Sequence, residues 1–360
     1  MFEFINGTTC LKISPENGAI HSVTMNGKMV SSTSDRAFRI RLLAENGDYE
    51  MISDSDFQDF SLEGNTSLHW RKCRKFPGLE FMLKIRCAEY GSFLFRPSVT
   101  GIPSGFQLEW ISAPVLGLPL DFETLYPHFE GFLQKAPPEA VHMEWETHFK
   151  FPGNCSYYPG ECQMQFLAAW SEGSGIYFAA DDPGHSIKYF GTAHRAEAPV
   201  METYMDCFCG TETPGQDYEL PYDLILRPFS GDWQNACEIY REWIEQDPAI
   251  RREFPLPEWL KESPVVIICP VRGGKSITGL PNGFIPYENM FPRIRHLAEQ
   301  FNSKVMVLLM RWDHNGPWMP PYYWPPVGGA ESFRRFRDLL HSEGHLLGVY
   351  GSGTYFTLKG

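Results

Sequence analysis

The chain of 360 residues is 43% hydrophobic and 15% aromatic, which suffices to bury a core without disulfides or metals, and its length predicts about two domains. Its net charge of -13 is scattered and includes no Lys/Arg stripe, so nucleic acid is an unsuitable partner and a neutral ligand is favoured. The N-terminus lacks a basic segment followed by an apolar one, and no apolar stretch approaches a membrane span, so we expect a cytoplasmic protein without a membrane partner.

Residues 1–229 show the short runs of antiparallel β-structure. The run AIHSVTM leads into Asn26-Gly27, the strongest short hairpin signal. Similar runs recur as FMLKIRC, FQLEW, QFLAAW, GIYFAAD and YDLILRPF, separated by turn residues. Many short strands with turn signals predict an antiparallel β-sandwich over residues 1–229.

The cysteines of this chain are interpreted as structural. There are nine, an odd number at irregular spacing, which fits reduced thiols. Cys207-Phe208-Cys209 has no second Cys or His pair at metal spacing beside it, and alternating Cys in a strand is typical of packing. We therefore expect neither a metal nor another cofactor.

Residues 230–255 predict a connecting helix and a linker. Ser230 or Asp232 can cap the helix start, and Pro248 lies just beyond its end. One helical face carries Trp233, Ala236, Cys237, Tyr240, Trp243 and Ile244. The segment REFPLPEWLKESP that follows is typical of a linker.

In residues 256–360, apolar strands alternate with amphipathic helices. Apolar runs begin at Val265, Val305 and Leu346. The inward positions predicted for the two helices between them are Ile294, Leu297, Ala298 and Phe301 in the first, and Phe333, Phe336, Leu339 and Leu340 in the second. Fully apolar strands between such helices predict parallel βα units with both sheet faces covered.

The first of these strands, in VVIICPVRGGKS, superficially resembles a phosphate-binding loop. That motif needs a glycine five positions before Gly274, where Cys269 stands, and a helix that starts at once. The segment ITGLPNGFIPYENM follows instead, with two Gly and two Pro. We interpret it as a loop after a parallel strand, where α/β folds place ligand contacts.

Several segments together resemble a known group of enzymes. LKISPENGAIHSVTMNGK is similar to the galactose-mutarotase-like sandwich that precedes some glycoside hydrolase barrels. LRPFSGDWQNACEIYREW, RWDHNGPWMPPYYWPP and GHLLGVYGSGT resemble bacterial proteins related to the α-N-acetylgalactosaminidases. The resemblance implies a multidomain β plus α/β protein: an antiparallel β-sandwich followed by a (β/α) barrel of a retaining α-glycosidase.

The resemblance also implies a deficit. A complete barrel takes eight strands and about 250 residues, whereas residues 256–360 provide about three βα units. In these families the nucleophile is an Asp at the end of the fourth barrel strand and the acid/base lies on a later one. Neither Asp181-Asp182, which precedes a turn, nor Glu144 and Glu146 is a convincing carboxylate pair.

We therefore expect an incomplete barrel, no catalytic residue in this chain, and a missing C-terminal barrel segment as its partner, so that whether the chain is an enzyme stays open. Two alternatives remain: a non-catalytic carbohydrate-binding protein, and a structural fragment that folds only with the missing segment. Exposed strand edges would favour association in the last case.

The candidate substrate-binding residues follow the three parallel strands. Sugar binding needs aromatic faces for C–H surfaces and polar groups for hydroxyls. The residues of this kind are Arg272 after the first strand, Trp312, Asp313, His314, Trp318, Tyr322 and Tyr323 after the second, and Ser352 after the third. Each has a structural alternative: Asp313 can cap a turn, Arg272 can pair with a carboxylate, and the aromatic residues, with Trp324, can pack a Pro-rich loop.

Overall fold

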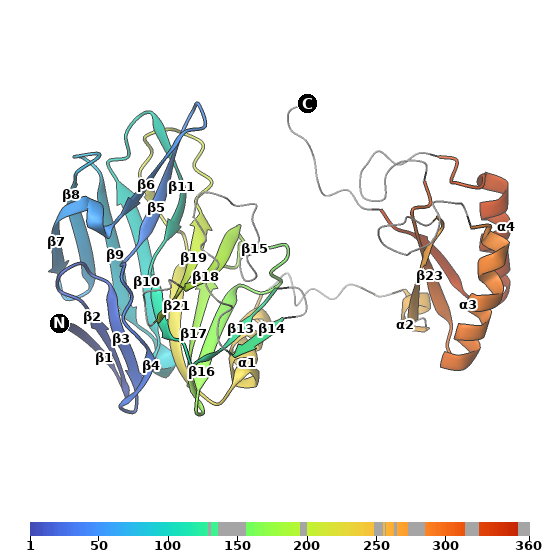
Figure 1. The fold of residues 1–360 in the computed structure, drawn as a ribbon, viewed down its shortest axis with the longest axis horizontal. Helices are drawn as coiled ribbons and strands as arrows, with labels where there is room; N and C mark the ends of the chain where they lie inside the picture. The colour runs from blue at the N-terminus through green and yellow to red at the C-terminus, as the bar shows by residue number, and fades with distance from the viewer. Residues whose placement is uncertain are drawn as a thin grey trace. The chain divides into compact units, whose positions relative to one another are not determined.

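The computed structural model describes residues 1–128, 131–135, 156–194, 200–247, 255, 257–262, 265–272, 285–313 and 324–351. The chain divides into two compact units, Met1–Arg251 (unit 1) and Arg252–Gly360 (unit 2). Figure 1 shows unit 1 as β-sheets and unit 2 as a small sheet with helices.

Within the described residues, unit 1 contains three antiparallel sheets, and the bounds of their strands are as follows. The four-stranded sheet is β1 (Phe2–Asn6), β2 (Thr9–Ile13), β3 (Ile20–Met25) and β4 (Lys28–Ser31). The ten-stranded sheet runs in the order β14 (Phe132–Lys135), β13 (Glu123–Tyr126), β16 (Phe166–Ser171), β17 (Ser174–Asp181), β21 (Asp223–Ser230), β10 (Phe93–Thr100), β9 (Glu80–Cys87), β8 (Ser67–Cys73) and β7 (Phe57–Glu63), with β20 (Tyr218–Glu219) on β10. The seven-stranded sheet runs β15 (Ser156–Tyr158), β18 (Lys188–His194), β19 (Val200–Phe208), β11 (Phe106–Ser112), β5 (Arg39–Ala44) and β6 (Tyr49–Ser53), with β12 (Leu116–Pro119) on β19. Two single turns of 3₁₀ helix, η1 (Asp54–Asp56) and η2 (Glu89–Gly91), complete unit 1 apart from its α-helix.

One apolar core joins the three sheets of unit 1. Leu11 and Val23 of the small sheet, Leu42 of the seven-stranded sheet and Phe81 of the ten-stranded sheet all belong to it. Phe38 stacks on Phe81 with ring centroids 3.6 Å apart. The predicted sandwich-like β unit is confirmed, and the predicted hairpin lies between β3 and β4.

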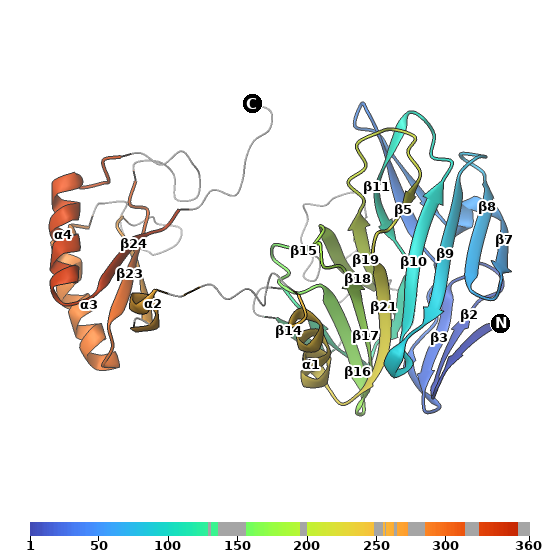
Figure 2. The ribbon, with the colours of Figure 1, turned by 180° about the vertical axis from the view of Figure 1, so that it is seen from behind.

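The helix α1 (Trp233–Ile244) packs on the outer face of the ten-stranded sheet, as Figure 2 shows. Asp232 caps it by accepting a hydrogen bond from the Gln234 amide at 2.9 Å. Ala236 and Tyr240 are buried against the outward side chains of β16, whereas Trp233, in the first turn, is exposed. The helix agrees with the sequence prediction, and of the two predicted cap residues, Ser230 and Asp232, the structure has Asp232 as the cap.

Unit 2 contains α2 (Glu258–Glu262), β22 (Val265–Pro270), α3 (Tyr287–Phe301), β23 (Val305–Met310), α4 (Ala330–Ser342) and β24 (Leu346–Val349). The strands pair in parallel in the order β22-β23-β24, with Val265 opposite Val305 and Met306 opposite Leu346. The predicted parallel arrangement of strands and helices is confirmed.

The prediction that both faces of this sheet are covered is wrong for the described residues. Val305, Val307 and Leu309 alternate onto one face, and α3 and α4 both pack there through side chains such as Ile294 and Phe336. On the opposite face, Val266 is 47% and Ile268 59% exposed. A uniformly apolar strand does not tell whether one face or two are covered.

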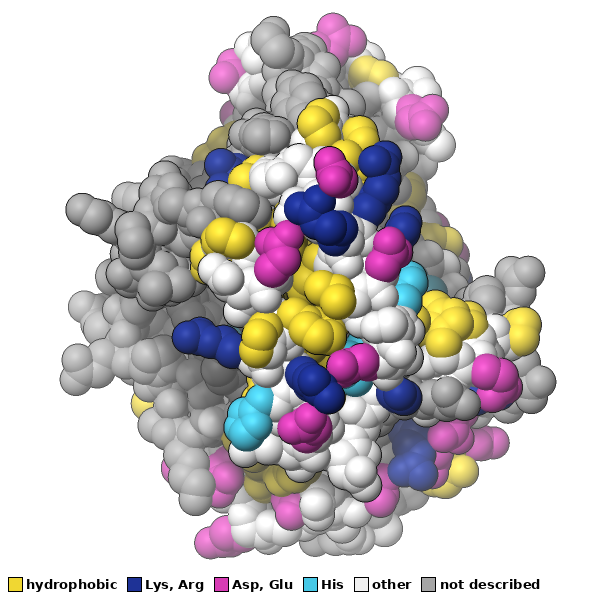
Figure 3. All heavy atoms as spheres, turned by 90° about the vertical axis from the view of Figure 1, so that its right-hand side faces the viewer, with side chains coloured by type: hydrophobic (Ala, Val, Ile, Leu, Met, Phe, Trp, Pro, Cys, Tyr) yellow, Lys and Arg dark blue, Asp and Glu magenta, His cyan; other side chains and the backbone are white. Residues whose placement is uncertain are grey.

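The outer surface of unit 2 is charged and solvated. Figure 3 shows basic and acidic side chains interspersed around apolar ones. Phe301 and Leu339, which the sequence analysis predicts to point inward, are exposed. Arg335 pairs with Glu288 and Glu331, and exposed ion pairs of this kind contribute little to stability. None of the helices in the described ranges is long and apolar enough to cross a membrane.

Candidate functional site

The carboxyl ends of β22, β23 and β24 lie at one edge of the sheet because the strands are parallel. Three predicted site residues, Arg272, Trp312 and Asp313, stand there. The other five, namely His314, Trp318, Tyr322, Tyr323 and Ser352, lie outside the described residues.

Trp312 ties the ends of two strands together. Its indole Nε1 donates to the carbonyl oxygen of Tyr350 at 3.0 Å, and its own carbonyl oxygen accepts from the Val327 amide at 2.7 Å. The ring is buried in the core of unit 2. Trp312 therefore fixes the position of the residue that follows it.

That residue, Asp313, is 2% exposed. Its Oδ2 is buried, and it accepts no hydrogen bond from any residue that the structure describes. A buried acceptor without a partner costs about 1 to 3 kcal/mol, and more when it is charged. Native structures keep few such groups, and each of them calls for an explanation.

The backbone just before Asp313 is strained as well. Arg311 has φ 55°, a left-handed conformation that costs a side-chain-bearing residue of order 1 to 3 kcal/mol. The end of β23 therefore combines two unfavourable features, the strained backbone of Arg311 and the buried Asp313 oxygen without a described partner. Strain of this kind is concentrated at functional sites, so the local structure favours a binding role for this edge.

Arg272 reaches the same edge from β22. The amide of the preceding Val271 donates to the Met310 carbonyl oxygen at 2.9 Å, and the Val271 carbonyl oxygen accepts from the Ile285 amide at 2.8 Å. The first of these bonds holds the backbone leading to Arg272 beside the end of β23, and Arg272 is half-buried. The Asp313 carboxylate and the Arg272 guanidinium thus follow the ends of the neighbouring strands β23 and β22.

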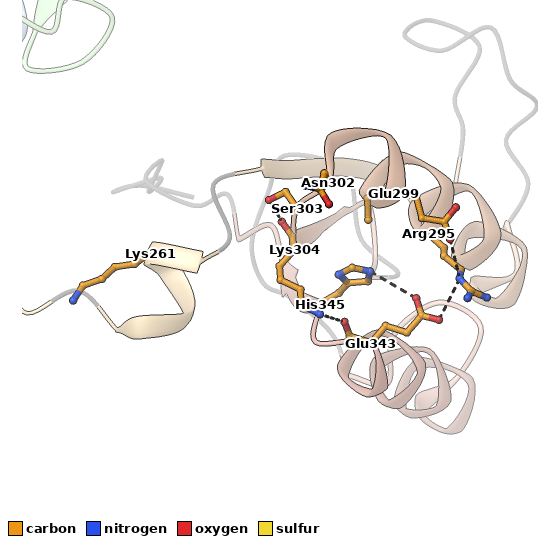
Figure 4. A pocket seen from close by; sticks show the side chains of 9 residues that line it. Lys261, Arg295, Glu299, Asn302, Ser303, Lys304, Glu343 and His345 are labelled. Atoms are coloured by element: carbon orange, nitrogen blue, oxygen red, sulfur yellow. Dashed lines mark hydrogen bonds and ion pairs between the residues drawn. The ribbon is translucent and has the colours of Figure 1, made fainter.

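Sequence reasoning did not point to a hollow of about 720 Å³ at the opposite, amino-terminal end of the strands. Figure 4 shows its charged groups joined in a network: Arg295 Nε lies 3.4 Å from Glu343 Oε1, and Lys304 Nζ donates to the Glu343 carbonyl oxygen at 2.5 Å. His345 Nδ1 accepts from the Val305 amide at 3.4 Å, and burial, followed by the Lys304 charge, lowers the pKa of His345. The charged groups already pair with one another, so this hollow fits a structural role.

Asp182 and two buried thiols of unit 1 also have structural roles. Asp182 accepts from Lys188 Nζ at 2.5 Å and from the Ser186 amide at 2.7 Å, so it closes the turn that follows β17. Cys207 and Cys209 are buried in the core, and burial raises the pKa of Cys207 to about 12. In the part of the chain that the structure describes, no three His, Cys, Asp or Glu side chains gather as metal ligands. Glu144 and Glu146 lie outside the described residues.

Comparisons with known proteins agree with this architecture. Residues 218–359 match a family described as a domain of unknown function (DUF6259). The chain is similar in structure to the α-N-acetylgalactosaminidase NagBb from Bifidobacterium bifidum: the GalNAc complex gives a TM-score of 0.67 at 16% identity over 99% of this chain and 60% of that one. The Gal-NHAc-DNJ complex of the same enzyme gives a TM-score of 0.68 at 17% identity over the same shares. An aldose epimerase homologue from C. elegans aligns over 64% of this chain and 100% of its own chain, at 11% identity and with a TM-score of 0.36. No curated protein matches the chain.

The fold is therefore that of a glycosidase structure. At such low identity the likeness shows the fold alone, and this chain spans about 60% of the length of that enzyme.

Proposed function

We propose that the protein is carbohydrate-active and that the carboxyl ends of β22, β23 and β24 form part of its sugar subsite. The observation that carries the proposal is the buried Asp313 carboxylate, whose Oδ2 has no partner among the described residues, in a chain with the fold of a glycosidase. Sugar hydroxyls are donors of the kind that this oxygen lacks.

Each candidate residue has a role in this proposal. Asp313 accepts from sugar hydroxyls, Arg272 donates to them, and the buried Trp312 positions Asp313. We propose that His314, Trp318, Tyr322, Tyr323 and Ser352 complete the subsite, with the aromatic rings covering the C–H face of the sugar.

Bond cleavage needs more than these residues. Glycoside hydrolysis uses two carboxyl groups, about 5 to 5.5 Å apart in retaining enzymes. Among the described residues that directly follow the three strands, Asp313 is the one carboxylate. We propose that further βα units of a barrel supply the nucleophile and the acid/base, so that this polypeptide alone binds sugar and does not cleave it.

Calorimetric titration with N-acetylgalactosamine and with galactose tests the binding proposal. We expect heat of binding from the wild-type protein, an affinity about tenfold or more weaker for Asp313→Asn, and no change for Asp338→Asn, an exposed acid-to-amide control on α4. No heat at millimolar sugar from a folded sample contradicts carbohydrate binding.

Turnover of aryl α-glycosides tests the catalytic part. We expect none. Turnover that Asp313→Asn abolishes would show that the chain holds a complete catalytic site.

A second candidate function, sugar binding alone, is favoured by Asp313 being the one carboxylate among the described residues at the strand ends. It predicts heat of binding with galactose or N-acetylgalactosamine and no turnover of aryl α-glycosides in any protein that contains these strands.

A further inference from the structure

Unit 1 carries a groove of about 400 Å³ on the outer face of its ten-stranded sheet, between η2 and α1. Figure 2 shows α1 beside the strands that form the floor of this groove. All its lining residues are described and belong to unit 1. Its volume falls within the range of about 300 to 1,000 Å³ usual for small-ligand sites.

The floor of the groove is an apolar row between two polar rows. Leu94 of β10 is the register partner of Ile225 of β21, which is the partner of Ala179 of β17, so these three side chains form one line across the sheet. They point away from the core because their neighbours in the strands, such as Phe95 and Phe178, point into it.

The polar rows flank this line on the same face. On one side, Asp181 and Asp223 are register partners, and Asp223 accepts from Arg96 Nε at 2.8 Å. On the other side, Arg227 is the partner of Tyr177. An apolar strip bordered by donors and acceptors matches a ligand with one apolar face and a polar perimeter.

Two aromatic side chains rise beside the floor, and each is held by a polar partner. The Arg227 guanidinium lies over the Tyr90 ring, 4.3 Å from its centroid. The Trp243 indole of α1 donates to Asp181 Oδ1 at 2.7 Å. Both rings therefore stand in defined positions before any ligand arrives, which reduces the entropy cost of binding.

Tyr90 is the less expected of the two. It has φ 56°, although it is not glycine, and its side chain is 70% exposed. The strained backbone thus turns a large ring toward solvent at the edge of an apolar floor. The contact with Arg227 holds the ring there, and an exposed ring beside an apolar floor suits a stacking role.

Charge decides which ligand class suits the groove. Its polar groups include the carboxylates of Glu89, Asp181 and Glu242 and the single guanidinium of Arg227, and the whole chain carries -13. Anions are disfavoured in such surroundings. Carboxylates accept hydrogen bonds from hydroxyl groups, and an amide such as that of Gln246 can both accept from them and donate to them.

We infer that this groove is a second saccharide-binding site, which takes a neutral pyranose unit with its C–H face on Tyr90 and Trp243 and its hydroxyls toward Asp181, Glu242 and Gln246. The choice of a saccharide among neutral ligands rests on the proposed function, whereas the groove itself is independent of the strand ends of unit 2. An aromatic platform with mixed donors and acceptors binds a single sugar unit at millimolar concentration.

The test uses the full chain with Asp313→Asn as the background, because this change weakens the proposed strand-end subsite. Tryptophan fluorescence and calorimetry are followed during titration with methyl galactoside and N-acetylgalactosamine. We expect millimolar binding to remain, and Tyr90→Ala to weaken it by about tenfold. Tyr90 is exposed, so this variant is expected to fold.

Two further variants sharpen the result. Trp233→Ala removes an exposed aromatic ring from α1, the helix that carries Trp243, but outside the groove, and is expected to leave the binding unchanged. Trp243→Phe keeps an aromatic ring but loses the hydrogen bond to Asp181, and weakens the binding less than Tyr90→Ala does.

The outcomes separate the two proposals. If the wild-type protein binds sugar and Asp313→Asn removes this binding completely, the groove site is overturned and the strand-end subsite stands. Binding that survives Asp313→Asn but is equally strong after Tyr90→Ala also overturns the groove site. If Tyr90→Ala removes the binding and Asp313→Asn leaves it intact, the groove site is supported and the strand-end subsite is contradicted. If neither the wild-type protein nor any variant binds sugar, both proposals are overturned.

Discussion

Replacing Asp313 by Asn is expected to make unit 2 more stable and its sugar binding weaker at the same time. The carboxylate is 2% exposed, and its Oδ2 has no partner among the described residues, so folding leaves this oxygen unsatisfied without ligand. The unsatisfied group costs about 1 to 3 kcal/mol. Asn has nearly the same shape without the charge, so we expect it to recover about 1 to 2 kcal/mol of this.

The binding effect has the opposite sign. A hydrogen bond to a charged group contributes about 1.5 to 3 kcal/mol, so its loss weakens the sugar affinity by about 10-fold to 150-fold. Both quantities come from the same atom, which is why they are expected to change together.

Hydrogen exchange of the β23 amides, Val305–Met310, measures the stability term. A local probe is needed because the two units can open independently. Calorimetry measures the affinity, and Asp338→Asn, which changes an exposed acid on α4, is expected to move neither. If Asp313→Asn speeds exchange in β23, the carboxylate stabilises the fold, and the proposed binding role of Asp313 is refuted.

Two further predictions concern unit 1. A methyl group added at Gly191 would meet the Tyr204 ring at 2.1 Å, so Gly191→Ala is expected to lower the free energy of unfolding, measured in urea, by about 1 to 3 kcal/mol. The control is Gly105→Ala, whose added methyl group has no atom within 4 Å and which is expected to stay within about 0.5 kcal/mol of the wild type. Equal stabilities of the two variants would contradict the close packing at Gly191. Burial raises the pKa of Asp54 from 3.8 to about 6, so the folded state keeps a proton that the unfolded state releases, and stability falls by up to about 3 kcal/mol as the pH rises from below 3.8 to above 6. Asp54→Asn is expected to reduce this slope without removing it, since burial raises the pKa of Asp206 to about 6 as well; an unchanged slope in urea titrations would contradict the raised pKa of Asp54.

The sequence predicts elements whose signal is local. The helical spacing of Ala236, Tyr240 and their neighbours identifies α1, and the sequence narrows its cap to Ser230 or Asp232, of which the structure has Asp232. The apolar runs identify the three parallel strands, and Asp313 is visible as an acid that directly follows one of them. In each case the deciding residues lie within a few positions of one another in the chain.

Features that depend on strand pairing are not visible in this way. Leu94, Ala179 and Ile225 form the floor of the groove only because β10, β21 and β17 lie side by side. The positive φ of Tyr90 has no signal in the sequence, since Tyr gives no indication of a left-handed backbone. The uncovered sheet face at Val266 is equally hidden, because an apolar strand has the same composition whether one face or both are buried.

The two candidate sites differ in how they are held ready for a ligand. At the strand end, Asp313 is buried and its Oδ2 has no partner among the described residues, so the proposed site is ready for a ligand at the expense of folding stability. In the groove, Trp243 bonds to Asp181 and Arg227 stacks on Tyr90, so these side chains are satisfied without ligand. Variants at the strand end are therefore expected to exchange affinity for stability, whereas variants of the groove lose affinity with no gain in stability. Comparing the two effects in one series of variants assigns each residue to a binding role or to a structural one.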